Sequence, residues 1–522
     1  MNHLEFKPLI EQLQSRAMRS VVSQYAFKSK PLTEYLRKVY SASPGNEGAL
    51  LADPVFEAMF PWEKAETPFE DLKDDLLSPH MMKMVGGFKF PFKHQLTAWN
   101  KILKEERSIL VSSGTGSGKT ECFLVPILED LVRQRAKNKK PLIGTQALFL
   151  YPLNALINSQ KERLSKWTKD LKGDVKFALY NGETKRYKKY VEEEQRKAPE
   201  QILSREALWE APPSILVTNA TMLEYMLVRK EDKPILDKSQ GMLKYIVLDE
   251  AHTYIGSHAA ELALLLRRVM IGFNVGPGTN NKVQIIATSA TIGEDSEQGN
   301  KQLAKYLADL AGVSENELSE KIEIVRGYRE IEKLATLDGY QAKLDFEKAN
   351  EIKKVSPEVL YHFLEGHTLA RRVRSLFEGD ERILSHFCLN KSNAFKLSDI
   401  VSVAKLYQSE ITASEVIHLL DLMSYAKIGD LAFVPLRLHL FQRTLSGLWA
   451  CINKECSERD PELLSDEWPF GQVYIDNKQV CGCGASVMEL LSCNGCGSVM
   501  VNKNRTPNLV FLSHIRSVTN TH

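Results

Sequence analysis

The sequence predicts an α/β protein in which a parallel sheet is flanked by helical regions and a small cysteine-rich module. Three observations carry this prediction. Short apolar runs rich in β-forming residues alternate with longer stretches of helical periodicity between residues 89 and 330. A glycine-rich loop follows one of these runs. Six of the eight cysteines fall between Cys451 and Cys496.

Length and composition allow several domains and restrict where in the cell the protein is expected. A chain of 522 residues is long for one core, so two to four domains are expected. No run of about 18 apolar residues occurs, and "MNHLEFKPLI" lacks the form of a signal peptide, so we expect a cytoplasmic protein without a membrane partner. The net charge of +2 requires any nucleic-acid surface to be a local patch.

Five segments are expected along the chain. They are a mostly helical accessory region (1–88), the α/β domain (89–330), a helical region (331–440), the cysteine module (441–505) and a polar tail (506–522). Within 331–440, "LSDIVSVAKL", "ITASEVIHLLDLMSYAKIG" and "LAFVPL" leave a winged helix open, although a plain helical linker is favoured.

The strands of the α/β domain are expected in six apolar runs. These are "SILVSSG", "ALFLYP", "VKFALY", "SILVTN", "YIVLDE" and "VQIIATSA", with "KIEIV" as a short later strand. Strands that are apolar on both faces and alternate with helices indicate a parallel sheet covered on both sides. In such sheets the chemistry lies beyond the carboxyl ends of the strands, where five of these six runs end in polar or glycine-containing clusters.

The stretch "SILVSSGTGSGKTECF" predicts a phosphate-binding loop between a strand and a helix. Its glycines allow successive N–H groups to point at phosphate oxygens, and the following helix adds its positive end. Lys119 would reach the β and γ phosphates, and the Thr120 hydroxyl would ligate magnesium. The usual first glycine is replaced by Ser113, a small residue. The candidate nucleotide-binding residues are Ser113, Gly114, Thr115, Gly116, Ser117, Gly118, Lys119 and Thr120.

Two acids close another predicted strand, "YIVLDE". Asp249 would hold magnesium, and Glu250 would polarise the attacking water as a general base. An Asp-Glu pair after a strand is common by itself. The phosphate loop about 130 residues upstream makes the catalytic interpretation specific.

Together these residues resemble the first motor domain of a superfamily 2 helicase of the DEAD/DEAH type, which has a RecA-like P-loop fold. The resemblance covers roughly residues 90–330. The matching positions are Ser113 to Thr120 (motif I), Asp249-Glu250-Ala251-His252 (motif II), Ser289-Ala290-Thr291 (motif III), Pro152-Leu153-Asn154-Ala155-Leu156 (motif Ia), Thr218-Asn219-Ala220-Thr221-Met222-Leu223 (motif Ib) and Gln95 in "FPFKHQ".

The resemblance implies roles for these positions. Lys119, Asp249, Glu250 and His252 would be catalytic, Gln95 would read adenine, and Ser289, Ala290 and Thr291 would couple hydrolysis to strand movement. Contact with a nucleic-acid backbone would come from Pro152, Leu153, Asn154, Thr218, Asn219 and Met222. Plainer alternatives remain: helix capping by Thr218 and Asn219, an ordinary turn at Pro152, a core histidine at His252 and a surface glutamine at Gln95.

"YPLNALINSQ", "VTNATMLEYMLVR" and "LDEAHTYIGSHAAELALLLRR" resemble, more narrowly, a bacterial group of large DEAH-type helicases with a cysteine module. This implies DNA as partner, with RNA not excluded, and a role in DNA repair or anti-phage defence. It also implies a second RecA-like domain carrying a Gln-x-x-Gly-Arg-x-x-Arg pattern, which we do not find in Glu294 to His522. We therefore expect a truncated or split helicase that hydrolyses ATP slowly alone. The alternative is an ATP-gated nucleic-acid-binding or regulatory subunit.

The cysteine spacing predicts a zinc-ribbon-like module. The six cysteines are Cys451, Cys456, Cys481, Cys483, Cys493 and Cys496. Four thiolates satisfy a tetrahedral structural zinc, and the spacing leaves open which four bind. Free thiols or one redox pair are the alternatives.

Two basic stretches have less specific interpretations. "TKRYKKYVEEEQRK" (residues 184–197) favours a solvated helical face over contact with nucleic acid. "LARRVRS" (residues 369–375) is basic on a predicted helix, with DNA contact as the minor alternative.

Overall fold

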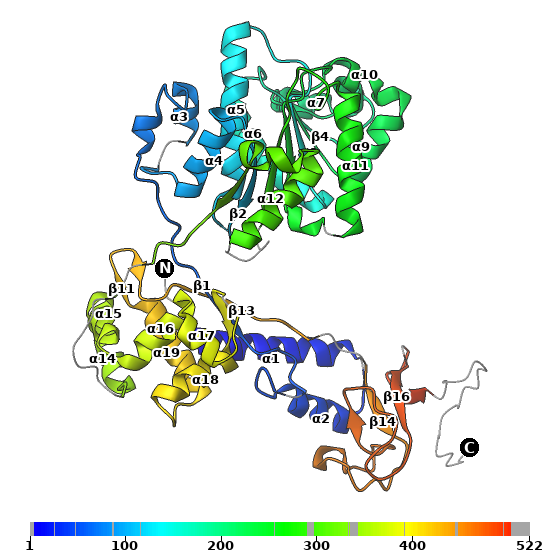
Figure 1. Cartoon of the computed structure of the whole chain (residues 1–522). Coiled ribbons are helices and arrows are strands. Elements are labelled where there is room, and N and C mark those ends of the chain that lie inside the picture. Colours follow the sequence, from blue (N-terminus) through cyan, green and yellow to red (C-terminus); the bar gives the residue numbers. More distant parts are fainter. Residues whose placement is uncertain are drawn as a thin grey trace, which may run out of the picture. The chain divides into compact units, whose positions relative to one another are not determined.

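The computed structural model describes residues 5–502 except positions 26, 47, 86–87, 115, 255, 290–296, 332–333, 335–342, 391, 444–446 and 494. The chain divides into two compact units, Pro61–Glu330 and a second one made of Met1–Phe60 with Ile331–His522 (Figure 1). The sequence-based segment 1–88 thus contributes to both units. No helix in the described part of the chain is long and apolar enough to cross a membrane.

The unit Pro61–Glu330 contains an eight-stranded parallel sheet in the order β5-β4-β6-β3-β7-β8-β2-β9. The strands are β2 (Ser108–Ser112), β3 (Ala147–Leu150), β4 (Phe177–Leu179), β5 (Gln201–Ile202), β6 (Ile215–Thr218), β7 (Tyr245–Leu248), β8 (Gln284–Ser289) and β9 (Ile322–Arg326). Every predicted strand is present, and the parallel sheet is confirmed. Only β5, two residues long, was not predicted, because it is too short to produce an apolar run.

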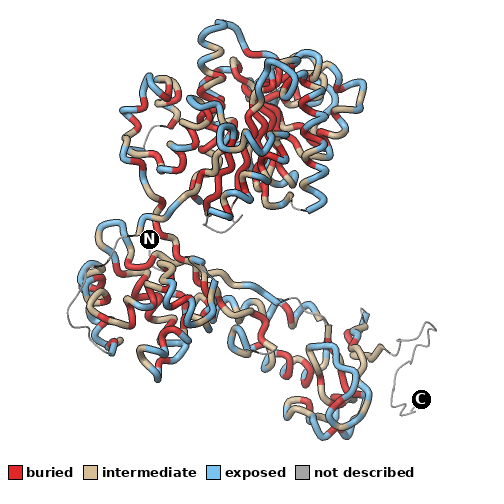
Figure 2. The backbone as a smooth tube through the Cα atoms, in the orientation of Figure 1, coloured by how far each residue is buried: buried red, intermediate tan, exposed pale blue. Residues whose placement is uncertain are grey.

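Both faces of this sheet are buried, as the doubly apolar strands require. Ile109 and Val111 of β2 belong to one core with α3, α4, α5 and α6, whereas Leu110 points into a second core with α8 to α12. Figure 2 shows the strands as a buried layer. The helices are α3 (Pro79–Val85), α4 (Lys93–Leu103), α5 (Lys119–Asn138), α6 (Asn154–Thr168), α7 (Glu192–Lys197), α8 (Arg205–Glu210), α9 (Ala220–Val228), α10 (Lys233–Asp237), α11 (Ser257–Gly272), α12 (Glu297–Ala311) and α13 (Leu318–Lys321).

The other unit joins the two ends of the chain. β1 (Val55–Ala58) pairs antiparallel with both β10 (Ala394–Lys396) and β13 (Leu436–His439), so the N-terminal segment completes a sheet with residues about 340 and 380 positions away. Its helices are α1 (Phe6–Gln24), α2 (Lys30–Tyr40), α14 (Phe346–Val355), α15 (Pro357–Glu365), α16 (Thr368–Glu378), α17 (Glu381–His386), α18 (Leu397–Tyr407) and α19 (Ala413–Tyr425). Its strands are β1 (Val55–Ala58), β10 (Ala394–Lys396), β11 (Lys427–Ile428), β12 (Leu431–Ala432), β13 (Leu436–His439), β14 (Trp449–Cys451), β15 (Val473–Tyr474), β16 (Val487–Ser492) and β17 (Val499–Asn502).

The region considered for a winged helix has two successive helices, α18 and α19, followed by the β11–β12 hairpin. However, β10 pairs with β1 and not with this hairpin. Helix α19 is packed into the core, and the buried Asp421 accepts a hydrogen bond from the Phe6 backbone N–H at 2.8 Å. In the neighbouring α16, Arg374 of the basic stretch is also buried and pairs with Glu378 at 2.6 Å. This side chain therefore supports the core and is not presented to DNA.

Candidate nucleotide and nucleic-acid site

The glycine loop lies between β2 and the first residue of α5, Lys119. Gly116 and Gly118 have φ angles of 74° and 73°, a region that glycine enters without strain. A Cβ atom on Gly118 would lie 2.3 Å from Nε2 of Gln95, so a larger residue would displace that side chain. Both glycines are therefore required by the loop geometry. Thr115, one of the predicted nucleotide-binding residues, lies outside the described residues.

Side chains on both sides hold the loop in shape. Nε2 of His94 lies 2.9 Å from the Ser117 carbonyl oxygen, and the hydroxyls of Ser113 and Ser117 are 2.6 Å apart. The Lys119 ammonium donates to the Ser113 carbonyl at 3.0 Å. Burial lowers the pKa of Lys119, whereas the negative charges of Glu250 and Asp249 oppose this shift. The lysine is thus partly desolvated, and the charges of the two acids favour its protonated form.

Gln95 connects the segment before α4 to the loop. Its Oε1 accepts the Phe92 backbone N–H at 3.0 Å, and its Nε2 donates to the Gly118 carbonyl at 3.2 Å. The side chain is buried, with 8% of its residue surface exposed, which excludes the plain surface glutamine. Both ends of its amide are already engaged with backbone, so its demonstrated role is structural.

The two acids follow β7, next to β8, which lies between β7 and β2 in the sheet. The Thr288 hydroxyl on β8 donates to the Asp249 carboxylate, and the Glu250 backbone N–H reaches the same hydroxyl at 3.3 Å. Burial raises the pKa of Asp249, and the Thr288 hydrogen bond acts in the opposite direction. Glu250 has a φ of 54°, a strained backbone conformation for a side-chain-bearing residue.

His252 is not a core histidine. About a third of its side chain is exposed, and its Nδ1 lies 3.3 Å from Oε2 of Glu250. The predicted magnesium ligand Thr120 is already engaged, because its hydroxyl accepts a hydrogen bond from Arg163 on α6. The donor set of Thr120 and Asp249, a hydroxyl and a buried carboxylate, is chemically suited to a hard cation such as magnesium.

The residues after β3 and β6 form a second cluster at the same sheet edge. Leu153 is 63% exposed and Asn154 is also exposed, while the Asn219 amide donates to the Asn154 side-chain oxygen at 2.8 Å. Asn219 also caps α9 by accepting the Met222 N–H at 2.7 Å. Asn219 thus caps the helix, which is the plainer alternative predicted for it. Pro152 is half-buried.

Two predicted nucleic-acid contacts need correction. The Thr218 side chain is fully buried and donates to the Tyr180 carbonyl at 2.6 Å. Met222 is 5% exposed and packs in the second core. Neither side chain is accessible to a nucleic-acid strand, because both are buried beneath the loop that was predicted to contact it.

The motif that would couple the two clusters is only partly described. Ser289 is buried at the end of β8, and its carbonyl accepts the Ser113 N–H at 3.2 Å. Motif III is therefore bonded directly to the glycine loop through its first residue. Ala290 and Thr291 lie outside the described residues.

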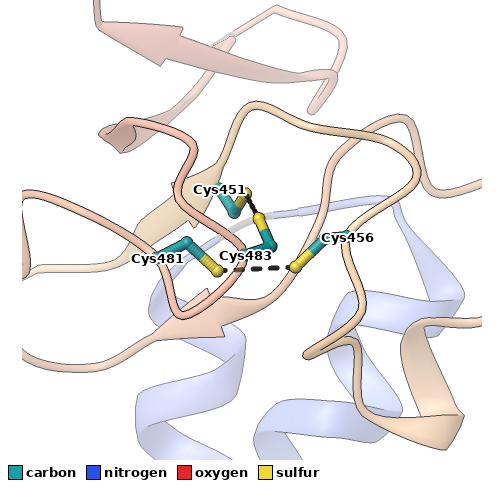
Figure 3. Close-up of side chains that lie close together, drawn as sticks. All are labelled: Cys451, Cys456, Cys481 and Cys483. Carbon is teal, nitrogen blue, oxygen red and sulfur yellow. Dashed lines mark hydrogen bonds between the residues drawn. The ribbon is translucent and has the colours of Figure 1, made fainter.

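Four cysteines of the other unit meet in one cluster (Figure 3). The Sγ atoms of Cys451, Cys456, Cys481 and Cys483 all lie within 4.8 Å of one another. The Cys451–Cys483 and Cys456–Cys481 sulfur pairs are 3.6 and 3.4 Å apart. Zinc–sulfur bonds of about 2.3 Å in a tetrahedron place sulfurs roughly 3.8 Å apart, so this donor set fits zinc.

Neighbouring groups support the cluster. Burial raises the pKa of Cys451, which keeps an isolated thiol there protonated. Burial also acts against ionisation of Cys481, but hydrogen bonds, the largest from Tyr474, bring its pKa down to about 7. A Cβ on Gly471 would lie 2.6 Å from Cβ of Cys456, so only glycine allows the chain to pass here. Cys493 and Cys496 are not members of the described four-cysteine cluster.

Comparison with known proteins matches the part of the chain that carries the first two clusters. Residues 92–298 match the family described as DEAD/DEAH box helicase. The chain contains a DEAD/DEAH box helicase domain. Residues 473–517 match a second family, described as the YjiV N-terminal domain.

Relatives of this helicase domain are longer proteins. Druantia protein DruE of Escherichia coli (strain UMEA 4076-1) is 26% identical in a match 583 residues long. This match covers 89% of this chain and 31% of DruE. The uncharacterized ATP-dependent helicase YprA of Bacillus subtilis (strain 168) is 28% identical over 281 residues, covering 53% of this chain and 32% of YprA. The chain therefore spans about a third of the length of these curated relatives. The crystal structure of the DUF1998 helicase MrfA bound to DNA is 20% identical and covers 67% of this chain and 39% of MrfA, with a TM-score of 0.36, too low to support an inference.

The helicase domain also contains site residues that sequence reasoning missed. Thr288 precedes motif III by one position, and its role depends on the pairing of β7 with β8. His94 stands beside Gln95, yet only the fold brings it against Ser117. Tyr306 of α12 donates to the carbonyls of Ala251 and Tyr254 at 3.0 Å and so holds the segment after the acids. No short motif signals these three contacts.

Proposed function

We propose that this helicase domain binds ATP with magnesium and hydrolyses it as the ATP-binding half of a superfamily 2 DNA helicase or translocase. The observation that supports this most directly is the placement of Lys119, Asp249 and Glu250 beyond the carboxyl ends of β2 and β7, which flank β8 in one parallel sheet. A phosphate-binding cation opposite two acids is the arrangement that phosphoryl transfer requires.

Each residue has a defined part in this mechanism. The N–H groups of Gly114 and of Gly116 to Thr120 would surround the phosphates, and the Lys119 ammonium would move from the Ser113 carbonyl to the β and γ oxygens. Thr120 and Asp249 would hold magnesium, so Arg163 must release the Thr120 hydroxyl. Magnesium, when bound, would neutralise phosphate charge. Glu250 would accept a proton from the attacking water. Nδ1 of His252 lies 3.3 Å from Oε2 of Glu250, so the histidine would respond to the charge of this carboxylate.

The nucleic-acid strand would follow the loops after β3 and β6. Exposed Leu153 and Asn154 and the half-buried Asn219 provide the surface there, with Pro152 beside them. Contacts of this type address the sugar-phosphate backbone and ignore base sequence. Ser289, with Ala290 and Thr291, would transmit the state of the phosphate loop to this surface. DNA as the substrate, and a role in DNA repair or anti-phage defence, rest on the narrower family resemblance.

Full motor activity would require a second RecA-like domain, supplied in trans or by a longer chain, because the helicases it resembles bind ATP between two such domains. Arginines from that domain accelerate hydrolysis by about three to five powers of ten in comparable systems. The four-cysteine cluster would bind a structural zinc ion. Zinc, when bound, would cross-link the segments that carry Cys451, Cys456, Cys481 and Cys483.

ATP turnover measured with and without single-stranded DNA tests the function. Lys119→Ala should abolish nucleotide binding, and Glu250→Gln should keep binding but lose turnover. Lys140→Ala, an exposed lysine of the same unit, serves as the control. Turnover should rise strongly when a protein carrying the second RecA-like domain is added. DNA binding that depends on nucleotide but never produces turnover, with any such partner, would instead support an ATP-gated binding subunit.

A further inference from the structure

Residues 185–190, the sequence Lys-Arg-Tyr-Lys-Lys-Tyr, form a well-anchored turn after β4. The Lys185 carbonyl accepts the Arg205 N–H at 2.8 Å, and the Arg186 carbonyl accepts the Glu206 N–H at 3.1 Å. The Lys188 N–H donates to the Glu206 carboxylate at 2.9 Å. The start of α8 therefore fixes the turn backbone. The stretch 184–197, predicted as a solvated helical face, is exposed at residues 185–190, but its helix is discontinuous, because Lys188–Tyr190 form a short 3₁₀ helix and α7 begins at Glu192.

The turn presents two aromatic rings to solvent. Tyr187 is 40% exposed and Tyr190 is 62% exposed, and their ring centroids lie 5.9 Å apart at 65°. The Lys189 ammonium lies over both rings, 5.6 Å from the Tyr187 centroid and 5.2 Å from that of Tyr190. A fixed backbone carrying exposed aromatic faces and positive charge has the features of a platform on which nucleic-acid bases stack.

The charges of the turn are available to phosphates. Lys188 pairs with Glu210, and Arg186 lies 4.0 Å from Glu231, but all four side chains are about half exposed or more. Ion pairs at such positions contribute little and are readily exchanged for other anions. Neither Lys185 nor Lys189 forms an ion pair with any described residue. The three glutamates that open α7, beginning at Glu192, mark where this basic surface ends.

The chain enters the turn from the same sheet edge as the candidate strand-binding loops, and the following residues lie along α8, where Lys188 pairs with Glu210. β4 is the neighbour of β6, whose end carries Asn219, and the Tyr180 carbonyl after β4 accepts the Thr218 hydroxyl. The order β4-β6-β3 therefore places the segment that leads into the turn, Asn219 and Asn154 along one edge of the sheet.

We propose that residues 185–190 form a base-stacking contact for single-stranded nucleic acid, in which Tyr187 and Tyr190 stack on bases and Lys185 and Lys189 neutralise phosphates. This inference rests on the proposed function. It adds to the backbone contacts a site that distinguishes single strands, whose bases are free to stack, from duplexes, whose bases are not.

The test compares the wild-type chain with Tyr187→Ala/Tyr190→Ala and Tyr187→Phe/Tyr190→Phe. Binding of fluorescein-labelled oligo(dT), the matching oligo(U) and a duplex is followed by anisotropy at low salt, with fluorescent ATP binding as the folding control. We expect the alanine pair to weaken single-strand binding at least about tenfold and duplex binding less than twofold. The phenylalanine pair should remain within twofold of wild type, because it keeps the rings. ATP affinity should be unchanged in both.

The failures are distinguishable. If wild type binds single strands and the alanine pair binds them equally well, or loses duplex binding to the same extent, the stacking inference is overturned and the proposed function stands. If wild type binds no nucleic acid with or without nucleotide, the proposed function fails and the inference fails with it. If the only change is weaker ATP binding by the alanine variant, the turn has a structural role and the inference is again overturned.

Discussion

The side-chain amide of Asn219 donates a hydrogen bond to the side-chain oxygen of Asn154 at 2.8 Å, which joins the loops after β6 and β3. Asn219 also caps α9 through the Met222 N–H. One asparagine thus stabilises a helix and sets the distance between two loops that would contact a strand.

The two roles of Asn219 can be separated by mutation. Asn219→Ala should lower the free energy of unfolding by about 1 kcal/mol, because the helix loses its cap. Asn154→Ala removes only the bond between the loops and should leave stability nearly unchanged, while ATP turnover loses much of its stimulation by DNA. Chemical unfolding and ATPase assays measure the two effects. Equal stimulation in Asn154→Ala and wild type would show that the loop connection is not used.

Protonation of His94 should weaken the folded helicase domain. Burial lowers its pKa to about 4, below the unfolded value of 6.5. As pH falls from about 6.5 to 4, the unfolded chain takes up the proton first, so stability decreases by up to roughly 3 kcal/mol in that window. Urea unfolding at several pH values measures this slope. His94→Gln should flatten it, whereas His258→Gln, at a 73% exposed side chain, should not.

Thr288 should control the acid limit of ATP hydrolysis. Its hydroxyl bonds to Asp249 and opposes the rise that burial imposes on the pKa of that carboxyl. Thr288→Val removes the hydrogen bond at similar volume, so the Asp249 pKa should rise further. Because the ionised form is required for magnesium, the acid limb of the kcat/KM profile should move to higher pH. Thr288→Ser keeps the hydroxyl and should retain the wild-type profile; identical profiles for all three proteins would contradict this role.

Zinc binding should depend on the four clustered cysteines and not on the other two cysteines of the module. Purified wild type should contain one zinc per chain by elemental analysis, and Cys451→Ser/Cys483→Ser should contain none. Cys493→Ser/Cys496→Ser is the matched control, since these residues lie outside the cluster, and it should retain one zinc. The first variant should also lower the melting temperature of its unit. Loss of zinc from the second variant alone would reverse the assignment.

Much of the helicase domain was predictable because its signals are local. The strands of the sheet are runs buried on both faces, and the glycine loop needs small residues at particular positions such as Gly116 and Gly118. The candidate nucleic-acid surface was less predictable. Thr218 and Asn219 are adjacent in motif Ib, yet one is buried and the other is partly accessible, a difference that depends on the packing of β4 against β6.

The sequence by itself determined the α/β class, the phosphate loop with Lys119, and the acids Asp249 and Glu250, because these depend on residue type and short spacing. Only the tertiary structure decided which cysteines meet, that Thr288 supports Asp249, and that Tyr187 and Tyr190 stand exposed on a fixed turn. These relationships join residues from different strands and loops. Their distances follow from sheet order and core packing, and no local pattern in the chain encodes them.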